Sequence, residues 1–137
     1  MAFELVILTE LEPAVGFTCD DSTGIEKGTL LELSDPMTVA KVAGAAPLII
    51  GVAAEEKVAN DGKTKIGVYM RSIFKGTAGG SISVGDGLIG ESGTNEFLTS
   101  TSGADEVEIC GIALEDATDG QTFKLLLNVG IGGSPET

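Results

Sequence analysis

The same short pattern occurs twice in this sequence. Ile49–Glu56 (IIGVAAEE) returns as Ile109–Asp116 (ICGIALED). A weaker pair precedes each copy, at Ile25–Leu30 and Ile82–Leu88. Each copy leads to an Asp-Gly pair and then to an apolar segment with strand-like alternation. This repetition indicates two related β units in one chain.

The spacing of the copies is uneven. The offset is 60 residues at Gly51 and Gly111 but 58 at the Asp-Gly pairs ending in Gly62 and Gly120, and aligning the following apolar faces needs 59. Asp-Gly favours a tight hairpin turn in which both central residues have positive φ. A one-residue slip turns every side chain of a strand over, so a bulge or a changed turn must absorb the drift. Convergent turn-and-strand patterns in a Gly-rich chain are the alternative to a true duplication.

Composition supports a β-rich protein and excludes several partners. The 137 residues suit one domain, and 20 glycines suit many turns. With no Trp and six other aromatic residues, the core must consist mainly of Val, Ile, Leu and Ala. The net charge of −13 repels nucleic acid and anionic membranes, so neither is an expected partner.

The N-terminal segment, residues 1–22, lies outside the repeat. Its apolar residues recur with period 2, which is typical of a strand, although the same residues could form a short amphipathic helix. Pro13 ends either element. We expect an extended N-terminal arm. Because Glu4 and Glu10 interrupt the apolar stretch and no basic region precedes it, we do not expect a signal peptide, and we expect synthesis in a reducing cytoplasm.

The remainder, residues 23–129, is predicted to be a single β-rich domain shaped like a barrel or sandwich. Its units are expected at about 24–74 and 81–129, joined by the Gly-rich segment 76–81, with a frayed tail at 130–137. Strands are predicted at 29–33, 38–42, 48–54, 64–69 and 123–129, and a loop or short hairpin at 91–106. A short helix at 53–59, and with it an α+β fold, is the alternative.

The sequence holds no histidine, and this removes the usual general base and the commonest metal ligand. Cys110 has no basic neighbour in sequence to lower its pKa and is expected to act as a small apolar residue. We therefore expect no catalytic residues, no cofactor and no enzyme activity. A hydrolase that uses carboxylates alone is the weakest alternative.

Charged residues form two kinds of cluster in the sequence. Acidic pairs could offer oxygen ligands to calcium, but none has the spacing of a calcium loop, and a solvated face with no metal is expected. These pairs are Asp20-Asp21, Glu55-Glu56, Asp105-Glu106 with Glu108, and Glu115-Asp116. Half of the basic residues lie at Lys63, Lys65, Arg71 and Lys75. They are interpreted as ordinary strand-face charge, with a contact strip for an acidic neighbouring subunit as the alternative.

Several segments taken together resemble a known family, the capsid decoration or cement proteins of tailed viruses and prophages. The resemblance covers roughly residues 13–129 and rests on the order and spacing of motifs that are individually short. These motifs are Phe17-Thr18, Thr23–Leu31, Ser34–Pro36, Gly51–Lys57, Asp61-Gly62, Gly67–Tyr69 and Gly111–Glu115.

The resemblance implies a virion structural protein that binds the outer surface of the expanded head and stabilises it. Lambda-type members are trimers at local threefold axes, with an N-terminal arm that orders against the shell. The implied partners are the major capsid protein and two further copies of this chain. The implied location is the outer capsid surface.

Here the arm would be residues 2–12, and the expected capsid-binding residues are Phe3, Glu4, Leu5, Val6, Ile7 and Leu8. Extended segments bind free strand edges through main-chain hydrogen bonds, with alternate side chains giving specificity. Deletion of residues 2–12 is expected to abolish shell binding and to leave the fold intact. The alternative function is a carbohydrate- or receptor-binding surface module, which requires exposed aromatic side chains.

Overall fold

The computed structural model describes residues 3–43, 48–91, 93–101 and 108–129. These residues form β-strands, turns and bridges and contain no α-helix, so the predicted β-rich fold is confirmed. In chain order the strands are β1 (Val6–Glu10), β2 (Val15–Thr18), β3 (Leu30–Asp35), β4 (Thr38–Lys41), β5 (Ile49–Ala53), β6 (Lys65–Tyr69), β7 (Arg71–Thr77), β8 (Gly87–Gly90), β9 (Phe97–Thr99), β10 (Gly111–Ala113) and β11 (Thr122–Asn128).

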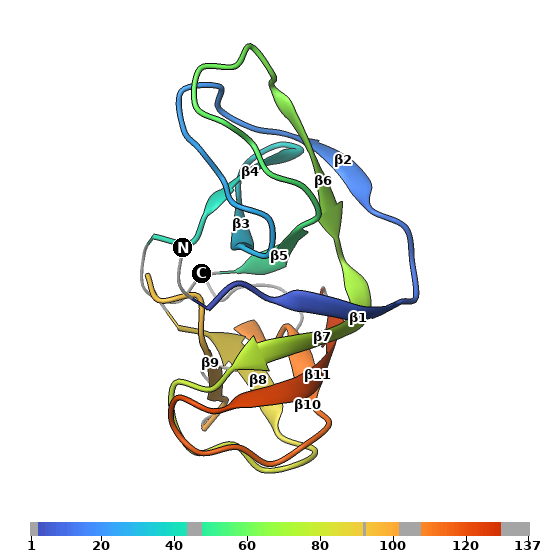
Figure 1. Ribbon diagram of the computed structural model, residues 1–137, viewed down its shortest axis with the longest axis vertical. Coiled ribbons are helices and arrows are strands. Elements are labelled where there is room, and N and C mark those ends of the chain that lie inside the picture. The colour runs from blue at the N-terminus through green and yellow to red at the C-terminus, as the bar shows by residue number, and fades with distance from the viewer. Residues whose placement is uncertain (1–2, 44–47, 92, 102–107, 130–137) are drawn as a thin grey trace.

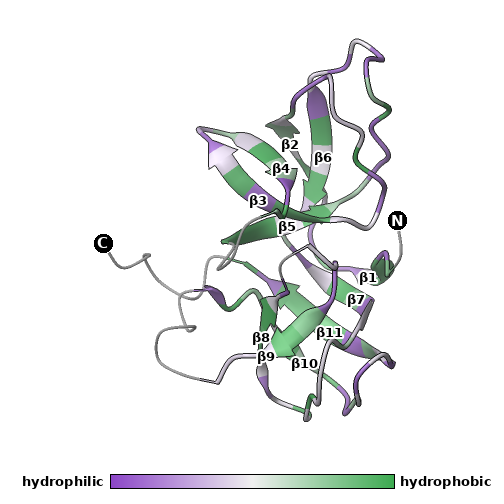
Figure 2. Cartoon of the chain, turned by 90° about the vertical axis from the view of Figure 1, so that its left-hand side faces the viewer, coloured by the Kyte–Doolittle hydropathy of each residue, from purple (hydrophilic) through white to green (hydrophobic). Residues whose placement is uncertain are grey.

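Strands β2 to β6 close into a small barrel in the order β2-β4-β3-β5-β6. The period-2 pattern decides which side chains enter it: β6 buries Ile66 and Val68 and exposes Lys65. Figure 2 shows apolar and polar residues alternating along β6. The barrel interior consists of Phe17, Cys19, Ile25, Leu31, Val39, Ala53, Ile66 and Val68.

The other strands form a six-stranded sheet in the order β1-β7-β11-β10-β8-β9. In Figure 1 the barrel lies above this sheet. Buried side chains of the sheet share one core with Leu30, Ile49 and Val52 of the barrel strands. The large residues that the sheet contributes are Phe74, Leu88, Phe97, Phe123, Leu125 and Leu127. The two units are therefore packed as one body.

The two units have equivalent strand orders. Strands β2 to β6 correspond one by one to β7 to β11. Neighbouring strands follow the order β2-β6-β5-β3-β4 in the first unit and β7-β11-β10-β8-β9 in the second, which is the same order counted from the first strand of each unit. A parallel contact also recurs, at Thr18 and Thr38 in the barrel and at Ala78 and Phe97 in the second unit. The structure thus contains the internal duplication.

Two glycines hold equivalent turns in the two units. The N–H of Gly28 donates to the carbonyl of Ala53 at 2.9 Å, and the N–H of Gly85 donates to that of Ala113 at 2.8 Å. Both glycines have a φ of 89°, which residues with a side chain rarely adopt. The weaker repeated pair in the sequence, Ile25–Leu30 and Ile82–Leu88, therefore marks a turn that both units share.

The register drift is larger than the sequence comparison suggests. Ala53 pairs with Val68 in the first unit, and Ala113 pairs with Leu125 in the second. The offset is therefore 60 on the fourth strand of each unit and 57 on the last. The first unit carries three more residues in the connection, so a longer loop rather than a bulge absorbs the difference.

This connection also corrects the expected hairpin at Asp61-Gly62. The flanking strands end at Ala53 and begin at Lys65, and Gly62 has positive φ whereas Asp61 does not. The two residues therefore do not form a two-residue hairpin turn. The helix considered for 53–59 is also absent, because Lys57 pairs with Ile25 in an isolated antiparallel bridge.

The Gly-rich segment 76–81 is not the joint between the units. Strand β7 continues through Gly76, and the units meet at Met70, between β6 and β7. Gly76 is required by packing, since a Cβ there would lie 2.8 Å from the ring of Phe97 and 2.9 Å from Leu125. Glycine here permits close packing within a strand rather than marking a linker.

Asn95 fastens three segments together inside the protein. Its Oδ1 accepts the N–H of Leu30 at 2.7 Å, and its Nδ2 donates to the carbonyls of Phe3 and Gly28 at 2.9 and 3.1 Å. The residue is 6% exposed and has a φ of 63°, a conformation that Asn tolerates better than most residues. One side chain of the second unit thus fixes the N-terminal segment and the barrel.

We predict that Asn95→Gly lowers the free energy of unfolding by at least about 2 kcal/mol, because it leaves the buried N–H of Leu30 without its partner and removes the bonds to Phe3 and Gly28. Glycine keeps the positive φ accessible, so the loss reports on the side chain. Asn60→Gly is the matched control, since Asn60 is exposed and has a φ of 61°. Urea unfolding measures both variants, and equal stability would show that the Asn95 contacts contribute nothing.

An ion cluster, made of the buried Lys57 and the partly exposed Asp21 and Asp61, holds the long connection of the barrel unit. Lys57 Nζ donates to Asp61 Oδ1 at 2.7 Å, to Asp21 Oδ1 at 2.9 Å, and to the carbonyls of Asp21 and Val58. The Lys57 side chain is 1% exposed. Its equivalent in the second unit is Ala117, which pairs with Ile82 as Lys57 pairs with Ile25. The cluster is therefore specific to the first unit.

The hydrogen bond from Lys57, aided by the backbone N–H of Lys63, lowers the pKa of Asp61 from 3.8 to about 2. A lowered folded-state pKa contributes stability that is present above the unfolded pKa and is lost as the pH falls toward the folded pKa. We predict that stability declines between about pH 4 and pH 2, and that Asp61→Asn is less stable near neutral pH but loses less across that window. Thermal unfolding at several pH values tests this, and parallel curves would contradict it.

Candidate functional site

The N-terminal segment is built into the fold. Strand β1 pairs antiparallel with β7, so the predicted strand is present, although a register shift between Ile7 and Thr9 interrupts its period-2 alternation, and β2 belongs to the barrel. Leu5 is 4% exposed and lies in the shared core, and its N–H donates to the carbonyl of Gly28 at 2.9 Å. Ile7 packs against the same core. The expected contact residues are thus divided between the interior and the surface.

The surface members of this set are Phe3, Glu4, Val6 and Leu8. Their apolar members are strongly exposed: Phe3 and Leu8 at 44% and Val6 at 56%. Glu4 is also exposed. These side chains are available for contact, and Leu5 and Ile7 hold the segment in place.

This division corrects the expectation that deletion of residues 2–12 leaves the fold intact. The deletion removes Leu5 from the core and exposes the edge of β7 along Ser72–Lys75. Removal of a buried leucine alone typically costs about 2–5 kcal/mol. Substitution of the exposed side chains is therefore the cleaner test of this segment.

The outer edge of β1 is poorly suited to a regular strand ladder. The register shifts between Ile7 and Thr9, so Leu8 is an extra residue in the strand, and β1 ends in the exposed Glu10. Bulges and charges on edge strands are features that limit strand addition. Contact at β1 is therefore more suited to side chains than to main-chain pairing.

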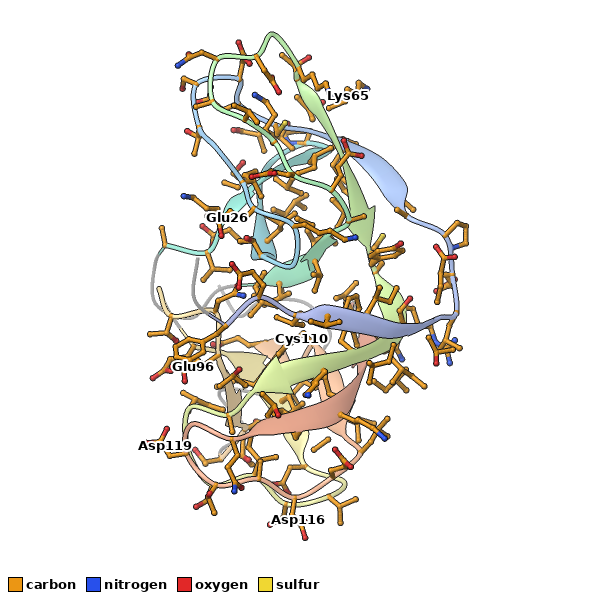
Figure 3. The ribbon with its side chains drawn as sticks, in the orientation of Figure 1. Glu26, Lys65, Glu96, Cys110, Asp116 and Asp119 are labelled. Carbon is orange, nitrogen blue, oxygen red and sulfur yellow. The ribbon has the colours of Figure 1, made fainter. Side chains whose placement is uncertain are left out.

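Three basic residues, here called the basic cluster, lie on neighbouring strands of the sheet. Lys75 is paired with Lys124 across β7 and β11, and Arg71 is paired with Asn128. None of the three forms an ion pair within the described residues. Lys63 and Lys65, the other members of the strip seen in the sequence, belong to the barrel unit, where Figure 3 shows Lys65. Lys124 could have been found from its place between Phe123 and Leu125, whose side chains face inward.

An apolar row crosses the outer face of the same sheet. Ile73, Leu126 and Ile112 are successive partners on β7, β11 and β10. Ile112 is 38% exposed and the other two are half-buried. This sheet therefore has one buried face and one outer face that combines an apolar row with basic side chains.

The acidic pairs support turns. Glu55 accepts the N–H of Gly67 at 3.3 Å, and Glu115 accepts the N–H of Lys124 at 2.9 Å. These contacts are equivalent in the two units, so shared turn geometry explains the recurrence. Across the described ranges, no three His, Cys, Asp or Glu side chains are grouped so that they could hold a metal ion. The pair at 105–106 lies outside the described residues.

Neither cysteine has the surroundings of a reactive thiol. Both are free and buried, and burial raises the pKa of Cys110 to about 12 and also raises that of Cys19. Figure 3 shows Cys110 in the interior of the molecule. A thiol with a raised pKa is a poor nucleophile near neutral pH.

Exposed aromatic platforms are scarce. Phe17, Phe74, Phe97 and Phe123 are at most 5% exposed, Tyr69 is half-buried, and only Phe3 is exposed. Stacking of a sugar ring on a flat aromatic surface is therefore not favoured by this fold. None of the described segments forms a helix with the length and apolar character needed to span a lipid bilayer.

Comparison with known proteins relates the chain to one sequence family and to solved structures. The sequence profile of the phage cement protein family matches residues 11–129, a range that begins just after β1. Among solved structures, the chain is similar to the N base of the head fiber gp8.5 of bacteriophage phi29. The TM-score is 0.58 at 21% identity, over 90% of this chain and 99% of that chain, and this likeness shows a common fold. No curated protein matches the chain.

The family match covers the barrel and nearly all of the sheet, including both copies of the repeated motif. The resemblance seen in the sequence is thereby confirmed. The chain belongs to the phage cement protein family.

Proposed function

We propose that this protein decorates the outer surface of an expanded phage head and stabilises the shell against the pressure of packaged DNA. Its partner is the major capsid protein, and three copies bind together at a local threefold site. The observation that carries the proposal is the family match over residues 11–129. The similar fold of a phage head fiber base agrees with a protein associated with the head.

The N-terminal segment is the proposed shell contact. Phe3, Val6 and Leu8 offer exposed apolar side chains on a strand that Leu5 anchors in the core. Because the segment is already ordered against β7, it loses little conformational entropy on binding. A trimer presents three such segments at once, and linked contacts bind more tightly than separate ones.

The charge of the protein agrees with an outer location. A net charge of −13 disfavours contact with packaged DNA and with anionic membranes. Like charge on the outside of finished particles also keeps them apart in solution. The side of the protein that faces the shell is then expected to include the basic cluster or the uncharged N-terminal side chains.

The proposal predicts that the purified protein co-sediments with expanded, undecorated heads and has the solution mass of a trimer by light scattering. The substitutions Val6→Ser and Leu8→Ser together should weaken binding by about tenfold or more, because they remove apolar area from the contact. Sedimentation over a range of protein concentrations measures both.

The matched control is Val58→Ser with Leu48→Ser, since Val58 and Leu48 lie in the barrel unit and are 58% and 41% exposed. Both double variants should keep the wild-type stability within about 0.5 kcal/mol per site. Failure of the wild-type protein to bind any expanded head rejects the function. Equal binding by the two double variants rejects only the N-terminal contact.

A further inference from the structure

Strand β2 has a free edge. The corresponding edge of its counterpart in the second unit, β7, is occupied by another strand. Val15 pairs with Val68 as Phe74 pairs with Leu125, so β2 and β7 are equivalent strands. On β7 the edge away from β11 carries β1. Among the described residues, β2 is paired on the corresponding side only at its last residue, Thr18. The duplicated fold therefore leaves one strand position filled and its equivalent open.

The main-chain groups of Gly16 point into this open position. The N–H of Thr18 donates to Met37 at 2.8 Å, away from β6, and the N–H of Cys19 donates to Thr64 at 2.9 Å, toward the β6 side. Because these directions alternate along a strand, Gly16 has the same direction as Thr18. Its N–H and C=O face the free edge and are available to another strand.

This edge lacks the features that protect β1. Residues 14–16 are uncharged and exposed, and β2 has no register shift in its pairing with β6. A Cβ at Gly16 would have no atom within 4 Å, so the face of the strand at this position is open. Open, flat and uncharged edges are the ones that accept an added strand.

A hollow lies beside the edge and can receive a side chain. Its volume is about 310 Å³, and it lies where the start of β2 meets the start of β7. Its lining combines apolar residues with one acid, one base and one amide: Glu12, Pro13, Val15, Met70, Arg71, Asn128 and Val129. Such a pocket next to a free edge gives an added strand side-chain specificity as well as main-chain bonds.

We propose that the edge at residues 14–16 accepts an antiparallel strand of the major capsid subunit, with one apolar side chain in the hollow. This inference rests on the proposed function. A second copy of this chain is a poor strand donor, because its edge strand β1 is bulged and ends in the charged Glu10. The added strand takes the place on β2 that β1 takes on β7.

Gly16→Pro tests the proposal, because proline removes the outward N–H and blocks an added strand. The N–H points away from β6, so the barrel ladder keeps its bonds. Gly16→Ala is the matched control, since it keeps the N–H and places its Cβ in open space. We expect Gly16→Pro to bind expanded heads at least about tenfold more weakly than Gly16→Ala, which should bind like the wild type.

The hydrogen-exchange rate of the Gly16 amide tests the proposal in the wild-type protein, without any substitution. The amide should exchange rapidly in the free protein and slowly on heads. If the wild type binds heads while this amide stays unprotected and Gly16→Pro binds normally, the inference fails and the proposed function stands. Protection that rises with protein concentration alone identifies a second copy as the occupant and overturns the proposal. Absence of wild-type binding rejects the proposed function itself.

Discussion

The fold depends on one core that the barrel and the sheet build together. Leu30, Ile49 and Val52 of the barrel strands pack into the same cluster as the aromatic and leucine side chains of the sheet. The fit is close: a Cβ at Gly90 would lie 2.9 Å from Ile49 Cδ1. Neither unit can bury these residues alone, so the two copies of the motif stabilise each other. Asn95 adds directional bonds to this apolar contact at the same junction.

The two copies have diverged in ways that give them different tasks. The first closes into a barrel and holds a longer connection with the ion cluster around Lys57. The second stays open, lengthens its first strand to seven residues and receives β1 along it. The results are one open sheet with a basic and apolar outer face, and one barrel with a short free edge at β2. These surfaces, rather than any reactive side chain, distinguish the protein.

Much of the fold follows from local patterns in the sequence. Alternation identified the strands that contain Ile66 and Leu125, because one buried face imposes period 2 on each. The repeated Gly-Val-Ala and Gly-Ile-Ala motifs located the equivalent strands β5 and β10. The turn at Asp61 was wrong because Lys57 binds its carboxylate, a long-range contact that dipeptide preferences do not include. Gly76 was misread as part of a linker, since only the fold reveals that the Phe97 ring requires its missing side chain.

The candidate site was only partly accessible to such reasoning. Alternation marked Phe3 to Leu8 as a strand with Leu5 and Val6 on opposite faces, but it could not show that Leu5 enters the core of this chain. The free edge at Gly16 could not be predicted, because an empty strand position is visible only against its filled equivalent on β7. We propose that this duplicated body stabilises a phage head from outside. Calorimetry of expanded heads with and without the protein tests that claim most directly: decoration should raise the temperature at which the shell disassembles, and an unchanged temperature at saturating protein would contradict it.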